Sequence, residues 1–332
     1  MLFSAAKAQD SLIAGSERHF EHLRQLTFGG ENAEAYFSFG EQMLSFQSTR
    51  GSFECDQIFA MDLTGNNLRM LSTGTGRTTC AYFLPGDSTI IYSSTYLADS
   101  LCPPRPDYSK GYIWAVYKTY DIFLADTHAA ILKRLTDTPG YDAEATVSPL
   151  GDRVVFTSVR NGDLDLYSMK PDGSDVRQLT NEIGYDGGAF YSPDGRQIVY
   201  RAYHPTDPKE IGEYEDLLRE GFVRPSTMEL FVMNADGTNK RQITHFGSAS
   251  FAPYFHPNGK QIIFASNKND PKGRNFDLFL IDTDGEHLEQ ITFNDTFDGF
   301  PMFTRDGKKL VFASNRNGKA RGETNIFIAD WK

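Results

Sequence analysis

An internal repeat restricts the folds open to this chain more than any other property. A doublet of an aliphatic residue followed by threonine or serine occurs six times, at Leu26-Thr27, Leu71-Ser72, Leu135-Thr136, Leu179-Thr180, Ile243-Thr244 and Ile291-Thr292. Successive doublets are 45, 64, 44, 64 and 48 residues apart, so the basic unit has about 44 residues and two units carry insertions of about 20. Such a period indicates a repeat protein whose units bury their apolar faces against one another.

Each unit reads as four short β-strands separated by turns. In the third unit, segments 153–158 and 164–169 are rich in β-branched and aromatic residues, and Asp172-Gly173 supplies a tight turn. Four-stranded antiparallel sheets repeated six times pack face to face around an axis in a β-propeller. We therefore predict an all-β fold, a six-bladed β-propeller of four-stranded antiparallel blades. An open stack of the same repeats is the alternative.

The two ends of the chain predict how the ring closes. A first doublet strand, at 22–28, precedes any complete unit, and the last unit stops at 325–331 without one. The N-terminal strand is therefore expected to complete the last blade, which would remove two exposed sheet edges. The expected organisation is a leader at 1–20 and a single propeller domain at 21–332, with insertions at about 96–120 and 201–228.

The leader and the cysteines bear on the compartment. Ala6 and Ala8 form a small-x-small pair after an apolar stretch, as at a secretory cleavage site. We expect a signal-peptide remnant and a periplasmic or secreted protein, with a frayed leader as the alternative. Three cysteines, Cys55, Cys80 and Cys102, permit one disulfide. We expect Cys80 to pair with Cys102, because Cys102 lies in an irregular insertion that a tether would fix; three buried thiols are the alternative.

Charge and hydropathy exclude several classes of function. With 33 basic and 44 acidic side chains, the net charge is −11. No basic stripe is available to neutralise phosphates, so nucleic acid is not an expected partner. No apolar stretch reaches the roughly 18 residues of a spanning helix, so no transmembrane segment is expected. We expect a monomer.

The repeat itself resembles a known family. The segments 191–200, YSPDGRQIVY, and 230–244, LFVMNADGTNKRQIT, are similar to the propeller repeats of the TolB-like family, and the likeness extends over nearly the whole chain. The resemblance implies a six-bladed propeller and a protein of the cell envelope. The N-terminal α/β domain of TolB has no expected counterpart in the roughly 20 residues before the first strand.

Equivalent positions of the six units predict a polar site at one channel mouth. Counted back from the serine of the Ser-Pro-Asp-Gly turn, such as Ser192, the sixth and fourth positions are polar or acidic in several units. Residues two apart on a strand share a face, so these side chains are expected to meet. The candidate ligand-binding residues are Asn32, Glu34, Arg77, Asp142, Glu144, Asp186 and Asp298, with Arg77 as the counter-charge.

The acidic members of this set favour a positively charged ligand. Grouped carboxylates raise one another's pKa unless a cation compensates them. A metal ion or a cationic ligand group is therefore expected at the mouth, although these residues could instead cap turns and face channel water. The metal candidates are Glu34, Asp142, Glu144, Asp186 and Asp298. Apart from such a divalent cation in the channel, no cofactor is expected.

The two insertions occupy equivalent places, between the second and third strands of units two and four. The first, 96–120, is rich in proline and tyrosine and could line a ligand groove or form a lid that packs its own aromatic rings. The second begins with Asp207-Pro208, a helix start signal, and predicts an amphipathic helix from Pro208 to Glu220. Both insertions are expected on the same face of the disc, as a surface for a partner.

Motifs of common enzyme chemistry are missing from the sequence. It has no G-x-S-x-G elbow, H-E-x-x-H pair, Walker loop or C-x-x-C pair. His256 replaces the serine of the fifth turn and is kept as a candidate site residue, with a turn role as the alternative. We favour a non-enzymatic exported binding or scaffold propeller that engages a protein, peptide or envelope polymer. The alternative is a cation-dependent propeller enzyme, of polysaccharide lyase or hydrolase type, or an accessory domain of a peptidase.

Overall fold

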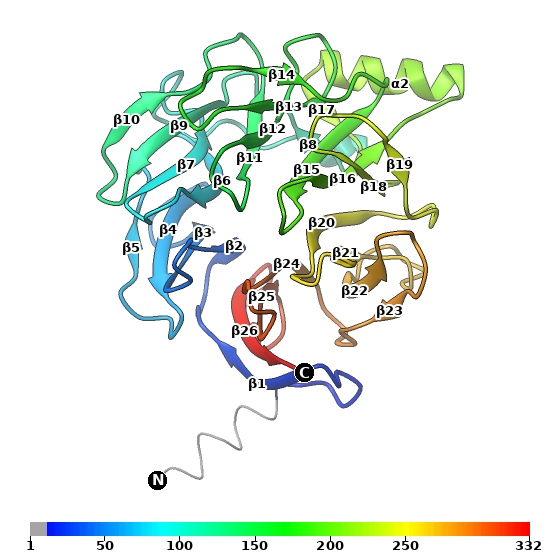
Figure 1. Cartoon of the computed structure of the whole chain (residues 1–332). Coiled ribbons are helices and arrows are strands. Elements are labelled where there is room, and N and C mark those ends of the chain that lie inside the picture. The colour runs from blue at the N-terminus through cyan, green and yellow to red at the C-terminus, as the bar shows by residue number, and fades with distance from the viewer. Residues whose placement is uncertain (1–11) are drawn as a thin grey trace.

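Six four-stranded antiparallel sheets surround a central axis in this protein (Figure 1). The computed structural model describes residues 12–332. The sheets follow one another along the chain as blades one to six, and each blade runs outward from its innermost strand. The predicted six-bladed β-propeller is therefore confirmed.

The blades have the following strands. Blade one consists of β2 (Glu31–Phe37), β3 (Met43–Thr49), β4 (Gln57–Asp62) and β5 (Arg69–Met70). Blade two consists of β6 (Thr78–Phe83), β7 (Thr89–Ser94), β9 (Asp121–Asp126) and β10 (Ile131–Arg134). Blade three consists of β11 (Asp142–Val147), β12 (Val154–Ser158), β13 (Asp165–Met169) and β14 (Arg177–Gln178).

The second half of the ring repeats this order. Blade four consists of β15 (Tyr185–Tyr191), β16 (Gln197–Tyr203), β18 (Glu229–Asn234) and β19 (Arg241–Gln242). Blade five consists of β20 (Ser250–Phe255), β21 (Gln261–Ser266), β22 (Asp277–Asp282) and β23 (Glu289–Gln290). Blade six consists of β24 (Asp298–Phe303), β25 (Lys309–Ser314), β26 (Asn325–Trp331) and β1 (Phe20–Gln25).

The ring is closed by β1, as predicted. This N-terminal strand pairs antiparallel with the C-terminal β26, from Phe20 opposite Trp331 to Gln25 opposite Phe327. Glu17, just before β1, is buried and bonded to Arg316 of blade six, with Oε1 2.9 Å from Nη2. Both ends of the described chain are thus fixed to the same blade. The expected cleavage after Ala8 lies outside the described residues.

The doublets complete the hydrogen bonding of each third strand. The hydroxyl of the threonine or serine accepts a backbone N–H from that strand, at 2.8–3.0 Å in all six blades. In blade three, for example, Leu166 N–H donates to Thr180 Oγ1, and Leu179 N–H donates to Leu166 O. Most of the fourth strands are short, so they leave a backbone N–H of the third strand without a partner in the sheet. The doublet hydroxyl accepts the hydrogen bond from this N–H. This explains why the doublet is the most regular part of the repeat.

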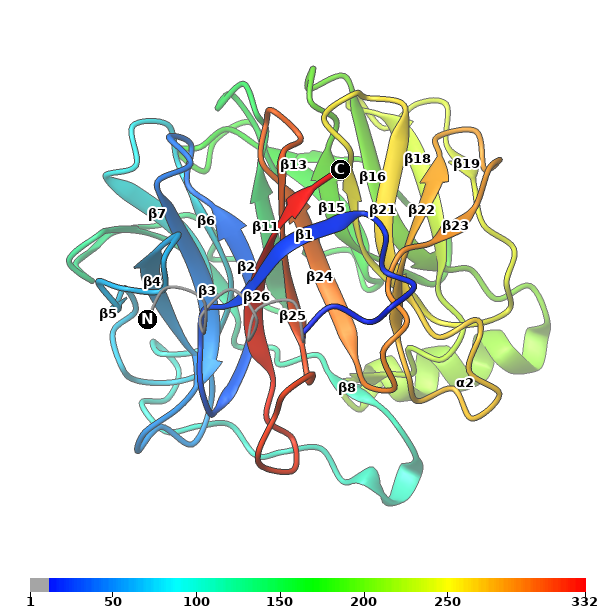
Figure 2. The same cartoon turned by 90° about the horizontal axis from the view of Figure 1, so that it is seen from below.

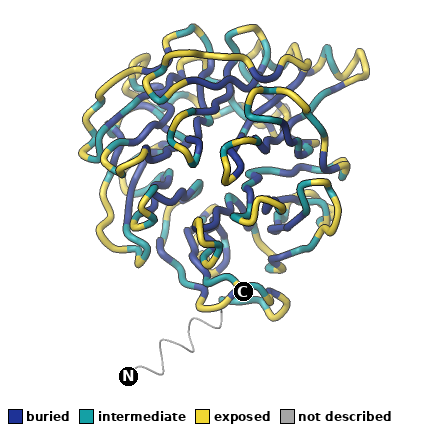
Figure 3. The backbone as a smooth tube through the Cα atoms, viewed as in Figure 1, coloured by how far each residue is buried: buried dark blue, intermediate teal, exposed yellow. Residues whose placement is uncertain are grey.

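Burial follows the blades (Figure 3). The apolar core lies between neighbouring sheets, and its largest fully buried side chains include Tyr92, Phe156, Phe264 and Phe312. Sheet-on-sheet packing of this kind holds each blade by its two neighbours. Among residues 12–332, no helix has the length and hydropathy of a membrane span.

Every innermost strand contains a β-bulge at the same place. The residue four positions before the turn serine has a positive φ in all six blades, between 48° and 58°, and the strand register shifts there. These residues are Glu34, Cys80, Glu144, Gly188, Ala252 and Phe300. A bulge interrupts the regular alternation of side chains, so residues two apart across the bulge no longer point to the same face. The expectation that the sixth and fourth positions share a face is therefore wrong.

Both insertions lie on the same face of the disc, as predicted (Figure 2). They pair directly, because β8 (Trp114–Ala115) of the first is antiparallel to β17 (Phe222–Val223) of the second. The second also carries α2 (Pro208–Arg219), capped by Asp207, in agreement with the predicted helix. We call residues 96–120, which include the short helix η1 (Tyr108–Lys110), the aromatic arm.

Candidate functional site

The aromatic arm covers a cavity at one mouth of the central channel. The cavity has a volume of about 410 Å³, and all six bulge residues line it. Its upper wall comes from the arm, including Tyr112, Trp114 and Tyr117. Trp114 also packs on Phe251 of blade five, with ring centroids 5.0 Å apart. We call this space the mouth cavity. The first insertion therefore lines a cavity, and its role in binding a ligand stays a prediction.

The floor of the mouth cavity is closed by aromatic rings. Tyr36 of blade one and Phe190 of blade four come from opposite sides of the ring, and their centroids are 5.6 Å apart. Phe190 in turn contacts Tyr254 of blade five at 5.4 Å, and Tyr36 contacts Tyr82 of blade two at 5.4 Å. Beyond this aromatic layer lies a separate cavity of about 360 Å³ at the turn end of the channel. The mouth cavity is therefore blind.

Three of the predicted aspartates do not reach the mouth cavity. Asp142, Asp186 and Asp298 are buried within their own blades, each against a cationic residue 18 positions later in the chain. Asp142 Oδ1 is 3.0 Å from Arg160 Nη2, Asp186 Oδ1 is 2.9 Å from His204 Nε2, and Asp298 Oδ2 is 2.9 Å from Arg316 Nη2. The expected gathering of five carboxylates around one mouth is wrong, because the bulge separates the two positions.

Two further candidates also lie away from the cavity. Asn32 is fully buried at the junction of blades one and six, where its Nδ2 donates to Thr324 O at 2.7 Å. His256 sits in its turn at the opposite end of the channel: its Nδ1 accepts from the Asn258 N–H at 3.1 Å, and its ring stands edge-on to Phe303. Glu34, Arg77 and Glu144 are the predicted site residues that line the mouth cavity.

Glu144 forms a buried ion pair with Arg201 of β16. Its Oε1 accepts from Arg201 Nη2 and from Tyr185 OH, and its Oε2 accepts from Thr157 Oγ1 and the Gly188 N–H, both at 2.9 Å. Burial by itself raises the pKa of Glu144, but Arg201 and these hydrogen bonds outweigh burial and hold the pKa below its usual value. Glu144 is therefore a fixed anion.

Arg201 enters the cavity wall through the space left by a glycine. A Cβ atom on Gly188 would lie 1.7 Å from Arg201 Nη1. The positive φ of Gly188 does not explain the glycine, because non-glycine residues such as Glu34 and Phe300 adopt the same conformation in the other five blades. The glycine is explained by the close approach of the Arg201 guanidinium group. Arg201 then lies over the rings of Trp114 and Tyr185, each centroid 5.3 Å away, which couples the aromatic arm to blade four.

Glu34 has no charged partner among the described residues. Its Oε2 accepts from Cys80 Sγ at 3.0 Å and from Tyr36 OH at 3.3 Å, no hydrogen bond within residues 12–332 reaches its Oε1, and the residue lines the cavity. Burial raises the pKa of Glu34 to about 7; the Cys80 hydrogen bond opposes this rise, and the negative charge of Glu144 adds to it. A carboxyl group that ionises near neutral pH thus lines a cavity rich in aromatic residues.

This raised pKa predicts that Glu34→Gln increases the stability of the folded protein in a pH-dependent way. Below pH 4.5 the carboxyl is protonated in the folded and unfolded chains alike, so the variant should match wild type. Between pH 4.5 and about 7 the unfolded chain ionises first, so wild type loses stability as pH rises and the glutamine variant does not. Thermal unfolding from pH 4 to 8 should show the variant melting higher only at the upper end. Parallel profiles would contradict the raised pKa, and Glu286→Gln, an exposed site, is the control.

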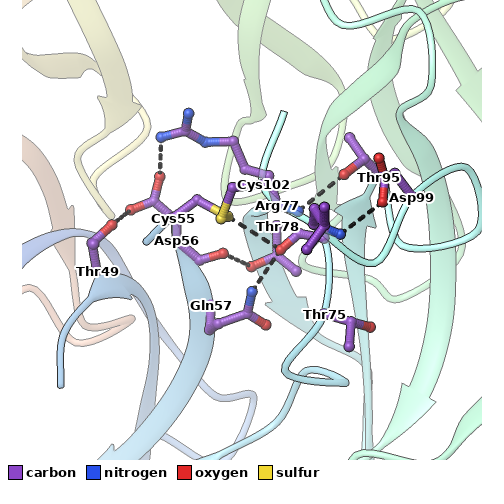
Figure 4. The surroundings of a disulfide bond; sticks show 12 residues. Thr49, Cys55, Asp56, Gln57, Thr75, Arg77, Thr78, Thr95, Asp99 and Cys102 are labelled. Carbon is purple, nitrogen blue, oxygen red and sulfur yellow. Dashed lines mark hydrogen bonds and ion pairs between the residues drawn. A yellow bond between two sulfur atoms is a disulfide. The ribbon is translucent and has the colours of Figure 1, made fainter. Parts of the chain in front are cut away.

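Arg77 lies at the rim of the cavity next to the disulfide (Figure 4). Its Nη2 is 2.8 Å from Asp56 Oδ2, and Asp56 follows Cys55, which is bonded to Cys102 of the aromatic arm. The expected Cys80–Cys102 pair is wrong, because Cys80 sits at a bulge and points into the channel, whereas Cys55 lies in the β3–β4 loop beneath the arm. Cys80 is a buried free thiol.

The sequence reasoning missed Arg201 and Asp56. Both positions lie outside the innermost strands, so a comparison of equivalent residues along those strands could not include them. One signal was available for Arg201. Gly188 is the single glycine among the six bulge positions, and a missing side chain in such a set indicates that another group fills its place.

A family model described as a TolB beta propeller domain matches residues 222–328 of this sequence. The match covers less than half of the chain, and in that part the blades resemble the TolB propeller. No curated protein sequence matches it. The matched part of this TolB-like propeller extends from the second insertion through blade six.

Solved structures agree on the fold of this TolB-like propeller. A putative TolB from Agrobacterium tumefaciens is 17% identical, with 91% of each chain covered and a TM-score of 0.58. An oligogalacturonate lyase from Vibrio parahaemolyticus is 15% identical, with 92% of this chain and 79% of that chain covered and a TM-score of 0.56. An oligogalacturonate lyase in complex with manganese is 16% identical, with 93% of each chain covered and a TM-score of 0.51. At these identities the likeness concerns the fold alone.

The donors of the mouth cavity do not fit a metal ion such as manganese. Within residues 12–332, no group of three or more His, Cys, Asp or Glu side chains is arranged to hold one. Of the cavity's carboxylates, Glu144 is committed to Arg201 and Asp56 to Arg77, which leaves Glu34. A single carboxylate is a poor site for a hard divalent cation, which needs several oxygen ligands. The described residues therefore do not provide enough ligands for the predicted metal site.

Proposed function

We propose that this TolB-like propeller is an exported binding protein that takes a cationic group of a protein or peptide partner into the mouth cavity. One observation carries the proposal. Four of the cavity's charged side chains form the pairs Glu144–Arg201 and Asp56–Arg77, and the fifth, Glu34, lines the cavity without an ion-pair partner among the described residues. An unpaired carboxylate surrounded by aromatic rings favours a cation, through charge pairing and through attraction of the cation to the rings.

Two features support the exported location in this proposal. The Cys55–Cys102 disulfide is of a kind that persists in oxidising compartments such as the periplasm or the extracellular space. The small-x-small pair Ala6 and Ala8 fits a secretory cleavage site. The composition of the cavity wall supports a peptide over a polysaccharide as the partner. A polyhydroxylated ligand would need a buried partner for each hydroxyl, whereas this wall is rich in aromatic residues, and the Gln47 amide oxygen already accepts from Thr79 Oγ1 at 2.8 Å.

A lyase or hydrolase is a second candidate, favoured by one observation. Glu34 ionises near pH 7, the range suited to a general base, and two of the similar folds are oligogalacturonate lyases. Incubation with oligogalacturonate should then yield an unsaturated product detected by its ultraviolet absorbance for a lyase, or new reducing ends for a hydrolase, and Glu34→Gln should abolish either product. No product with wild type would contradict this candidate.

The binding proposal is tested with a matched pair of small probes. Phenethylammonium should raise the melting temperature of wild type in a concentration-dependent way, whereas 3-phenylpropanoate, of similar shape and opposite charge, should not. Glu34→Gln should lose the response to the amine, and Glu286→Gln should keep it. An equal response to the two probes, or an amine response that survives Glu34→Gln, would contradict the proposal. If calcium, manganese or zinc raises the melting temperature of wild type and not that of Glu34→Gln, the ligand at Glu34 is a metal ion and not an ammonium group.

A further inference from the structure

The mouth cavity is shaped for the end of a chain. Its floor is closed by the Tyr36–Phe190 contact, and its upper wall is the aromatic arm. A passing strand would need two openings, whereas a blind cavity of about 410 Å³ admits a chain terminus or a single side chain. The lone carboxylate of Glu34 selects between the two termini, because it repels a carboxylate and attracts an ammonium group.

Arg201 supplies a second point of recognition. Its side chain is 9% exposed, and its Nη2 bonds to Glu144 and Tyr185. Its Nε is buried without a partner. Its Nη1 makes no hydrogen bond within the described residues and lies against Gly188, a residue that lines the cavity, where an added Cβ would be 1.7 Å from it. The structure holds this guanidinium in place and leaves donors unused.

The charge state of Arg201 indicates what these donors suit. Glu144 already neutralises the guanidinium, so a further anion would meet little net attraction. A neutral acceptor such as a peptide carbonyl oxygen meets no such difficulty, and it would satisfy a buried donor that is costly to leave unpaired. Glu34 and Arg201 both line the mouth cavity, and the charge of Arg201 lowers the pKa of Glu34.

We propose that the mouth cavity binds the free N-terminus of a polypeptide, with the α-ammonium group at Glu34 and the first carbonyl oxygen at Arg201. This inference rests on the proposed function. An N-terminus carries a carbonyl oxygen three bonds from its ammonium nitrogen, whereas the ammonium group of a lysine side chain has no acceptor so close. The first side chain would lie against the apolar bulge residues Ala252 and Phe300 and the neighbouring Phe251.

An N-terminal ligand has a characteristic pH profile. The α-amino group has an ordinary pKa of about 7.7–8.0, and the pKa of Glu34 is about 7. Affinity should therefore be greatest between about pH 7 and 8, falling below as Glu34 gains a proton and above as the amine loses one. A lysine side chain, with a pKa of about 10.4, would show no fall at pH 9. The ionisable groups near Glu34 are Tyr36, Asp56, Arg77, Cys80, Glu144 and Arg201.

The experiment is calorimetric titration of the full chain with four probes. They are phenylalanyl-glycyl-glycinamide, its N-acetyl form, N-acetyl-lysine amide and phenethylammonium. N-acetylation should weaken binding by at least about 30-fold, because it removes one partner of a buried charge pair. Phenethylammonium, which keeps the charge and lacks the carbonyl group, should bind about 10-fold more weakly than the tripeptide. The role of Arg201 is tested by changing the ligand and not the protein, because a substitution of Arg201 would leave Glu144 buried without a partner and could unfold the chain.

The outcomes separate this inference from the proposed function. If N-acetyl-lysine amide binds as tightly as the tripeptide, the result supports the proposed binding of a cationic group and contradicts the N-terminal inference. If phenethylammonium equals the tripeptide, or binding of the tripeptide is unchanged at pH 9, the role of the first carbonyl or of the α-amino group is overturned. If the N-acetyl tripeptide binds as well as the free one, or no amine binds, both proposals fall. Loss of tripeptide binding in Glu34→Gln, with retention in Glu286→Gln, supports both.

Discussion

Replacing Glu144 with alanine is expected to lower the free energy of unfolding by about 3–5 kcal/mol, the cost of removing one member of a buried ion pair. Arg201 would keep its charge with 7% of its surface exposed and no anion beside it. Tyr185 OH, Thr157 Oγ1 and the Gly188 N–H would also lose their common acceptor. Urea denaturation at neutral pH measures the loss directly.

A paired variant separates charge from packing. Glu144→Leu combined with Arg201→Met removes both charges and should recover most of the loss, because a buried ion pair exchanged for apolar side chains is often close to neutral in stability. Wild-type stability in Glu144→Ala would contradict the buried pair. A double variant less stable than the single one would show that packing of Arg201 on Trp114 and Tyr185 matters more than its charge.

Replacing Cys102 with serine is expected to cost about 2–4 kcal/mol, since the disulfide closes a loop between residues 47 apart in sequence. The loss should be concentrated in the aromatic arm, because the first part of the arm is tied to blade one by this bond, whereas its later part pairs with β17. Hydrogen exchange should therefore rise in residues 96–113 and stay unchanged in the blades.

The third cysteine provides the matched control. Cys80→Ser also removes a sulfur, keeps a donor for Glu34, and leaves the arm attached. It should retain wild-type exchange in the arm. Equal exchange of the arm in both variants would mean that the disulfide does not hold it.

The blades could be predicted from the sequence because their determinants are local. Strand alternation, Asp-Gly turns and the aliphatic-hydroxyl doublet lie within one unit and recur six times, so each copy supports the others. The doublet hydroxyl bonds a strand 14 residues earlier, as between Thr136 and Ile122, which keeps it at a constant place in the repeat. Ring closure by β1 followed from the same count of strands.

The site was harder to predict because its geometry depends on contacts that repeats do not encode. The bulge at Glu34 and its equivalents breaks two-residue alternation, and no residue type marks it, since Glu, Cys, Gly, Ala and Phe all occupy it. Asp142 and its counterparts were therefore assigned to the wrong surface. The Cys55–Cys102 bond depends on the path of the arm across blade one, which spacing alone does not reveal.

The aromatic layer between Tyr36 and Phe190 determines how a ligand could travel through this ring. A tunnel open at both ends would let a polymer thread through and be handled processively. Here a bound segment must leave by the opening through which it came. The length of polypeptide that the cavity can hold is fixed by the depth of the cavity.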